Sequence, residues 1–310
     1  IWLKANGRSD VERGFRYRLA GSEEWIEVSG VEHNAGRFSA CVEGLEPLTD
    51  YEVVAYCGEA TTPIVALTTE DVFTLPNSGF EAWSTYDGCI YPYAEGDAPF
   101  WGTGNPGAAI ANATLTSPVA DVRPGSEGSS AASLQSMKAA VMGIGKFAAG
   151  NLFVGTFSMS GLDGTVNFGR DFSFTAKPKS LSFWMKHNEG TIDETGAGSP
   201  AEATGTDKAT IMVIITNWET PYAVNTADSS TFFSMSDLAT MEGVIGYGYI
   251  EKRESATEWA EYTIDINYRE DMKNVKPRKL VVSFTPSGFG DYFTGSTSSW
   301  MYVDDIKFNY

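Results

Sequence analysis

The chain has 310 residues, of which 40 are acidic and 22 basic, so its formal net charge is -18. This charge repels phosphate backbones and anionic lipid head groups, and it argues against binding to nucleic acid or to a membrane surface. No apolar run approaches the roughly 20 residues that a membrane helix requires, so we expect no membrane insertion within this chain.

Composition favours an all-β fold with two domains. Aromatic residues make up 13% of the chain, charged residues only 20%, and there are 32 glycines. Aromatic residues suit the faces of sheets and glycine suits tight turns. Cys41, Cys57 and Cys89 show no Cys-x-x-Cys spacing. An odd number without that spacing predicts free thiols and neither a zinc ribbon nor a disulfide framework.

Residues 1–72 are expected to form the first domain. Apolar and polar residues alternate in 15–19, 25–28 and 37–42, with glycines between them, which predicts short antiparallel strands. Residues 45–56 place Leu, Pro, Thr and Tyr before another alternating strand and resemble the tyrosine corner of fibronectin type III or immunoglobulin-like modules. The resemblance implies a β-sandwich whose first strand is missing, in which the Tyr51 hydroxyl bonds back to the chain. We expect this domain to be a spacer.

Residues 73–310 are expected to form a larger second domain. Residues 190–207 lack apolar periodicity and predict an exposed loop, and residues 236–242 allow a short helical turn. The strand candidates are residues 147–157, 180–186, 210–216, 244–251, 260–268, 279–286 and 299–308.

The two ends of this domain carry matching motifs. Residues 75–83 resemble the Asn-x-Gly-Phe-Glu start of jelly-roll carbohydrate-binding modules, and residues 300–308 resemble their closing strand. In such modules a glutamate and an aspartate from these ends meet at a calcium ion, which favours carboxylate oxygens. The resemblance implies a structural Ca²⁺ held by Glu81 and Asp304 or Asp305, with Glu127 as a third candidate. The alternative is a metal-free end, in which these carboxylates accept backbone hydrogen bonds, and no cofactor is required.

The loop at 91–107 is rich in proline, glycine and aromatic residues, so it forms neither a regular strand nor a helix. Aromatic rings beside polar groups suit the apolar faces and hydroxyl edges of sugars. The alternative is that Phe100 and Trp101 close the end of the barrel. The candidate ligand-binding residues are Trp101, Tyr91, Tyr93, Asn105, Asp97, Asp291 and Trp218.

Three segments, 101–105, 146–155 and 290–296, together resemble the putative carbohydrate metabolism domain family. The resemblance covers residues 74–310 and implies a β-jelly-roll that handles carbohydrate. Such proteins resemble secreted or surface components of bacterial glycan-utilisation systems. We therefore expect a polysaccharide or oligosaccharide ligand, other surface glycan-utilisation proteins as partners, and a secreted protein or cell-surface lipoprotein whose signal would lie upstream of Ile1.

Three functions remain open. The first is glycan binding without catalysis. The second is a glycoside hydrolase using Asp97, Asp291 or Glu95, which requires two carboxylates about 5 to 5.5 Å or about 6.5 to 9.5 Å apart. The third is a structural or adhesive surface protein. The second domain has one histidine, His187, which we expect to be a loop residue at the end of a strand.

Overall fold

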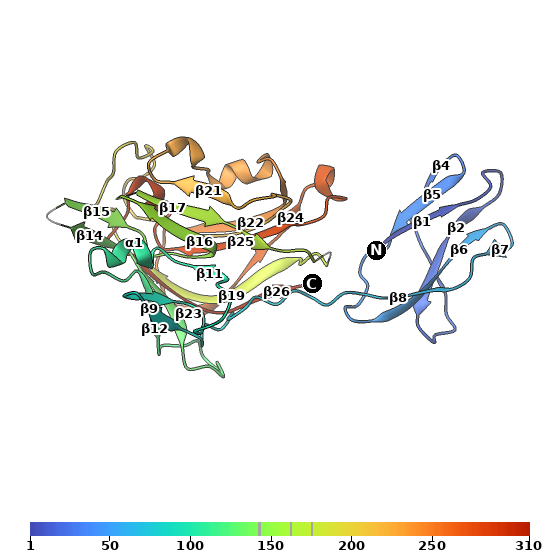
Figure 1. Ribbon diagram of the computed structural model, residues 1–310, viewed down its shortest axis with the longest axis horizontal. Helices are drawn as coiled ribbons and strands as arrows, with labels where there is room; N and C mark the ends of the chain where they lie inside the picture. Colours follow the sequence, from blue (N-terminus) through green and yellow to red (C-terminus); the bar gives the residue numbers. More distant parts are fainter. Residues whose placement is uncertain (142–143, 162, 175) are drawn as a thin grey trace. The chain divides into compact units, whose positions relative to one another are not determined.

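The computed structural model describes residues 1–141, 144–161, 163–174 and 176–310 (Figure 1). It divides into two compact units, Ile1–Phe73 and Thr74–Tyr310. Both are built almost entirely of β-strands, which confirms the all-β prediction. Within these residues no helix is long and apolar enough to cross a membrane.

The first unit is made of two small antiparallel sheets. One has the order β1-β5-β4, and the other has the order β3-β2-β6-β7 with β8 beside β6. Phe15 on β2 and Phe38 on β5 are both buried, with ring centroids 4.8 Å apart, so the two sheets pack face to face. The strands are β1 (Trp2–Asn6), β2 (Arg13–Leu19), β3 (Ile26–Glu27), β4 (Glu32–Asn34), β5 (Arg37–Cys41), β6 (Asp50–Cys57), β7 (Ala60–Thr61) and β8 (Val65–Thr68).

Tyr51 makes the contact that the sequence predicted for it. The Tyr51 side chain is buried, and its hydroxyl accepts a hydrogen bond from the backbone N–H of Glu46 at 3.1 Å. A buried tyrosine bound back to the chain in this way holds the turn before its strand against the sandwich. The three cysteines are free thiols, as expected.

The second unit contains the remaining elements. Its strands are β9 (Ser84–Tyr86), β10 (Cys89–Tyr91), β11 (Trp101–Gly102), β12 (Thr116–Val119), β13 (Ala131–Gln135), β14 (Met137–Val141), β15 (Ile144–Ala148), β16 (Leu152–Ser160), β17 (Asp163–Phe168), β18 (Arg170–Asp171), β19 (Ser180–Asn188), β20 (Ala209–Thr216), β21 (Tyr222–Asn225), β22 (Val244–Lys252), β23 (Ala256–Asp265), β24 (Asn267–Tyr268), β25 (Lys279–Thr285) and β26 (Trp300–Asn309). Its helical turns are α1 (Asn105–Ala109), η1 (Ser229–Thr231), η2 (Met235–Ala239), η3 (Glu270–Met272) and η4 (Gly290–Tyr292).

Two antiparallel sheets of the second unit form a sandwich. The larger sheet has the order β21-β17-β16-β25-β20-β22-β24, and the smaller sheet has the order β12-β13-β26-β19-β23. Figure 1 shows β16 and β25 in one layer and β19 and β26 in the other. Phe284 of β25 and Phe183 of β19 meet edge to face between the layers, with ring centroids 5.0 Å apart. Because both rings are fully buried, this contact lies in the core of the sandwich.

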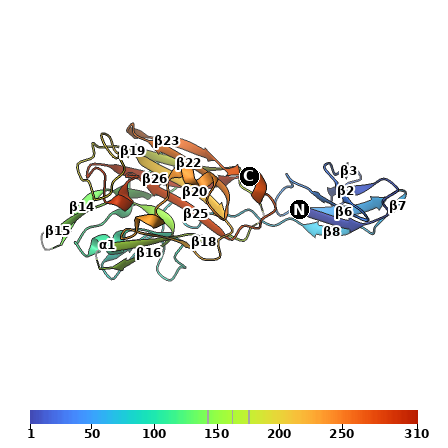
Figure 2. The same ribbon diagram turned by 90° about the horizontal axis from the view of Figure 1, so that it is seen from above.

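The larger sheet bends sharply along β16. Leu152 and Phe153 pair with β25, whereas the segment from Gly155 onward pairs with β17. A Cβ added at Gly155 would lie 2.3 Å from the backbone oxygen of Asn167, so only glycine fits at the bend. Val166 and Phe168 of β17 line one cavity with Met212 of β20 and Ser283 of β25, so β17 curls over the outer face of those two strands. Figures 1 and 2 both place β14, β15 and α1 at one end of this unit.

The strand predicted over 147–157 is wrong in its extent. The chain forms β15 and β16 with a break between them. Within the break, a Cβ at Gly150 would lie 2.6 Å from the backbone nitrogen of Gln135, so only glycine fits there. The segment 190–207 contains no named strand, as predicted, but it is not exposed throughout, since Ala203 and Asp207 are buried. The strand predicted over 260–268 is divided between β23 and β24, which belong to different sheets. The other predicted strands of this domain match observed strands to within a few residues.

Candidate functional site

A cavity of about 250 Å³ lies on the outer face of the larger sheet, away from the core of the sandwich. The alternation of β25 produces this arrangement. Phe284 points into the core, whereas its neighbours Ser283 and Thr285 line the cavity. Phe153, which pairs with Ser283, lines the same cavity from β16. Curling of β17 over this face turns the face of the sheet into a pocket.

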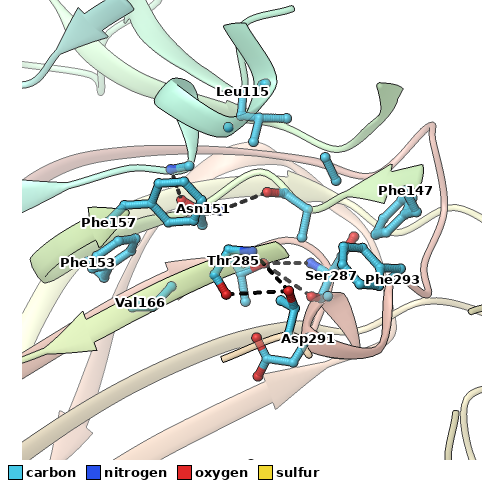
Figure 3. A pocket seen from close by; sticks show the side chains of 18 of the residues that line it. Leu115, Phe147, Asn151, Phe153, Phe157, Val166, Thr285, Ser287, Asp291 and Phe293 are labelled. Atoms are coloured by element: carbon cyan, nitrogen blue, oxygen red, sulfur yellow. Dashed lines mark hydrogen bonds between the residues drawn. The ribbon is translucent and has the colours of Figure 1, made fainter. Parts of the chain in front are cut away.

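The walls of the cavity are mainly apolar. Figure 3 shows Phe153, Phe157 and Val166 on one side of it and Phe147 and Phe293 on the other. The larger apolar side chains that line it are Ile110, Leu115, Phe147, Phe153, Phe157, Met159, Val166, Phe168, Met212, Phe233, Met235 and Phe293.

Asp291 is the one carboxylate among the described residues that line the cavity. It belongs to η4, which follows β25, and Figure 3 shows it beside Thr285 and Ser287. Its side chain is accessible to solvent, and no hydrogen bond or ion pair to its carboxylate is found in the described part of the chain. The surrounding protein reduces its hydration, which raises the pKa of Asp291 to about 6. Asp291 is therefore a free acceptor within an apolar cavity.

Most other polar side chains of the lining are bonded to the protein. Asn151 accepts the Gly104 N–H at 2.6 Å and donates to the backbone oxygen of Ala149 at 2.9 Å. Thr285 Oγ1 accepts the N–H of Ser287 at 3.1 Å. These bonds hold the loops around the cavity and leave those groups little capacity for a ligand.

Behind the wall, Ser287 joins the cavity to a buried polar network. Its hydroxyl lies 2.7 Å from the hydroxyl of Ser136 and donates to Asp207 Oδ2 at 2.6 Å. Asp207 also accepts the N–H of Ser296 at 2.8 Å and the hydroxyl of Ser299 at 3.1 Å. Because each of these side chains is fully or almost fully buried, the network fixes the loop that carries Asp291.

The prediction that Trp101 offers a sugar platform is wrong. Its side chain is 1% exposed, it packs against the rings of Phe80 and Phe100, and its indole N–H donates to the backbone oxygen of Pro76 at 2.7 Å. The alternative, in which Trp101 closes one end of the barrel, agrees with this burial.

The ligand role predicted for Asn105 is also wrong. This side chain is 1% exposed and bonds the backbone oxygens of Ile90 and Thr116 and the backbone N–H groups of Leu115 and Thr116. A primary amide with all its groups paired inside the protein has a structural role.

The remaining candidates do not join Asp291 in the cavity. Tyr91 stacks on Tyr86 with ring centroids 4.5 Å apart and lies 5.4 Å from the ring of Tyr93. Trp218 packs on Tyr222, and its indole N–H donates to the backbone oxygen of Glu242. None of Tyr91, Tyr93, Glu95, Asp97 and Trp218 lines the cavity formed by the described residues.

The predicted calcium ligands lie apart from the cavity. Glu81 accepts the N–H groups of Ser129 and Ser130 at 3.0 Å, and Asp305 forms an ion pair with Arg123. Among the described residues, no three Asp, Glu, His or Cys side chains lie close enough together to hold a metal ion. Glu127 is therefore not part of such a group. The contacts of Glu81 match the alternative of carboxylates that accept backbone hydrogen bonds.

Asp304 differs from these carboxylates. It is fully buried, its Oδ2 accepts the N–H of Arg123 at 3.1 Å, and its Oδ1 has no hydrogen-bond partner. Burial raises the pKa of Asp304 to about 6. An unpartnered buried carboxylate oxygen is the kind of group that a cation would satisfy, so Ca²⁺ stays a prediction centred on this residue.

His187 was expected in a loop, and that prediction is wrong. It lies within β19, fully buried, and its Nδ1 is 2.9 Å from Glu189 Oε1. The cause is the longer strand, which extends to Asn188 and carries the ring into the interior. His187 does not line the cavity and is not placed to act as a base there.

Sequence reasoning found Asp291 but missed the aromatic walls. A signal was present in β16, where Phe153, Phe157 and Met159 recur at even spacing and share one face. Period two alone does not say whether such a face meets the core or a cavity.

Comparisons with known proteins agree with this fold. A crystal structure described as a putative glycoside hydrolase from Bacteroides thetaiotaomicron VPI-5482 matches with a TM-score of 0.56 and 18% identity, over 97% of this chain and 97% of that chain. Another so described, from Bacteroides vulgatus ATCC 8482, matches with a TM-score of 0.52 and 19% identity, over 74% of this chain and 96% of that one. At these identities the likeness shows the fold alone.

No match was found among curated proteins. The family model described as "Putative carbohydrate metabolism domain" matches residues 78–309, which is more than half of the chain. This match covers the larger sheet, the cavity and Asp291. The chain therefore belongs to the Putative carbohydrate metabolism domain family.

Proposed function

We propose that the second unit binds a carbohydrate-containing ligand at the cavity on the outer face of the larger sheet. The observation that carries this proposal is the free carboxylate of Asp291 among aromatic rings, in a domain of a carbohydrate family. Aromatic rings pack on the apolar faces of sugars, and a carboxylate accepts hydrogen bonds from their hydroxyls.

The number of carboxylates that line the cavity supports binding without hydrolysis. Glycoside hydrolysis ordinarily uses two carboxyl groups that flank the scissile bond. Among the described residues the cavity lining contains one, Asp291, and neither Glu95 nor Asp97 lines the cavity. The two structures described as glycoside hydrolases favour hydrolysis as the second candidate, with Asp291 as its acid.

A glycan array followed by calorimetry tests the proposal. We expect retention of at least one glycan and a loss of affinity of about tenfold in Asp291→Asn, because an amide is a weaker acceptor than a carboxylate. Asp97→Asn is the matched control, since Asp97 is exposed and outside the cavity. The proposal fails if no glycan is retained or if both variants bind like the parent. Release of reducing sugar that is lost in Asp291→Asn would favour the hydrolase instead.

We further propose that the protein acts outside the cell, secreted or at the surface, with other glycan-utilisation proteins. Its acidic net charge supports this as a property of an extracellular surface. Fractionation of the producing cells tests the location, and recovery of the protein only in the cytoplasm would contradict it.

A further inference from the structure

The interior of the cavity offers few free polar groups for a sugar. The strands that form its floor, β16, β17, β20 and β25, pair with one another or with neighbouring strands, so most of their backbone groups are used in the sheet. Asn151, Thr285 and Ser287 are bonded within the protein.

Of three further polar side chains of the lining, two are bonded within the protein. Lys146 forms an ion pair with Asp163 at 3.0 Å, and Thr226 Oγ1 accepts the N–H of Gly164 at 3.0 Å. The hydroxyl of Thr210 is buried and has no hydrogen-bond partner among the described residues. Among the described side chains, Ser283 and Asp291 remain as accessible groups without a hydrogen-bond partner.

A sugar ring placed wholly inside would therefore leave most of its hydroxyls unpaired. Each polar group that is buried without a partner lowers affinity by roughly tenfold or more. An apolar ring carries no such penalty, and aromatic walls contact it in edge-to-face and offset arrangements. The balance favours an apolar occupant of the interior.

The volume indicates the size of that occupant. An apolar cavity of about 150 Å³ holds one benzene molecule. The present cavity, at about 250 Å³, has room for one substituted aromatic ring. It is small for a disaccharide, because pockets that hold drug-sized ligands measure roughly 300 to 1,000 Å³.

We infer that the ligand is a glycoconjugate whose aromatic aglycone enters the cavity, while its sugar lies outside the apolar interior and directs a hydroxyl to Asp291. The inference rests on the proposed function and names its ligand class. The aromatic walls contact the aglycone, and Asp291 supplies the accessible acceptor for the polar part.

Matched glycosides test the inference on the unaltered protein. Phenyl and methyl glycosides of glucose, galactose, mannose, xylose and arabinose are compared by calorimetry, with phenol alone as the sugar-free probe. We expect at least one phenyl glycoside to bind about tenfold or more tightly than its methyl counterpart, because the ring is removed from water. We also expect it to bind more tightly than phenol.

The outcomes separate the two proposals. Equal affinity of phenyl and methyl glycosides would overturn the aglycone inference and leave carbohydrate binding standing. Phenol binding as tightly as its glycosides would support an apolar site and overturn carbohydrate recognition. Binding of no probe would count against both.

A cavity-filling variant locates the aglycone. Val166→Phe should abolish the preference for phenyl over methyl glycosides, because its larger ring takes up space at the wall that Figure 3 shows. Far-UV circular dichroism checks that the variant folds. If the variant does not fold, saturation-transfer NMR with a phenyl glycoside and the parent protein provides the test. The strongest transfer to the phenyl protons would support the inference. The strongest transfer to the sugar protons would overturn it.

Discussion

His187 and Glu189 form a hydrogen-bonded pair inside the second unit, with His187 Nδ1 2.9 Å from Glu189 Oε1 and both side chains buried. Burial, together with the charge of Lys252, lowers the pKa of His187 to about 4. Burial and the charge of Asp207 raise the pKa of Glu189 to about 9. From these directions we expect both groups to be neutral at pH 7, with the Glu189 carboxyl donating its proton to Nδ1.

Glu189→Gln should preserve this contact, because the side-chain amide also donates to Nδ1. Glu189→Ala should be less stable than Glu189→Gln by about 1–3 kcal/mol, since it leaves a buried ring nitrogen unpaired. Urea unfolding at pH 7 measures the difference. Equal free energies of unfolding for the two variants would show that the contact contributes nothing.

Ionisation of Glu189 should make the folded protein less stable as the pH rises. Since the folded pKa of Glu189 is raised, its contribution to stability is lost as pH rises from about 4.5 towards 9. Glu189→Gln should therefore be more stable than the parent at pH 8, and this difference in stability should become smaller towards pH 5. Thermal melts at both values check this, and a gap that widens on acidification would contradict the assignment.

Asp291 should also make the stability of the folded protein depend on pH. Its folded pKa of about 6 lies above the ordinary value of 3.8, so its ionisation destabilises the folded state as pH rises through that interval. Asp291→Asn should melt at a higher temperature than the parent at pH 8 and at the same temperature near pH 3.5. The control is Asp97→Asn, which changes an exposed residue outside the cavity and should show no such pattern.

Trp101 should affect stability and leave ligand binding intact. Trp101→Ala should cost about 3–5 kcal/mol in the free energy of unfolding, because a large buried ring is removed. Trp101→Phe should cost less, since it loses chiefly the indole bond to Pro76. Denaturant unfolding measures both, and calorimetry on Trp101→Phe checks binding. Lost affinity in that folded variant would restore Trp101 to the ligand site.

Calcium should act through Asp304. If a cation satisfies its unpartnered Oδ1, millimolar Ca²⁺ should raise the melting temperature of the parent by several degrees, since a ligand that binds only the folded state stabilises it. Asp304→Asn, which removes the negative charge, should not respond. An unchanged melting temperature of the parent with Ca²⁺ or with a chelator would favour the metal-free arrangement shown by Glu81.

Much of the fold follows from local pattern. The strand candidates 210–216 and 279–286 match β20 and β25 closely, because a short, mostly apolar run suits a strand that is buried in the sheet. The Tyr51 contact was predictable since it spans five residues. The need for glycine at residue 150 was not predictable, because the backbone of Gln135, which leaves no room for a Cβ there, comes near only in the folded chain.

The sequence by itself determined the all-β class, the strands and the presence of an aromatic-rich carbohydrate-type domain, because these depend on periodicity and on short motifs. Only the tertiary structure decided which aromatic rings face solvent. Trp101 and Phe157 look alike as sequence features, yet the first is buried against Phe80 and Phe100 and the second lines the cavity. The curl of β17 over β25 makes that distinction, since it creates a concave face from residues distant in the chain.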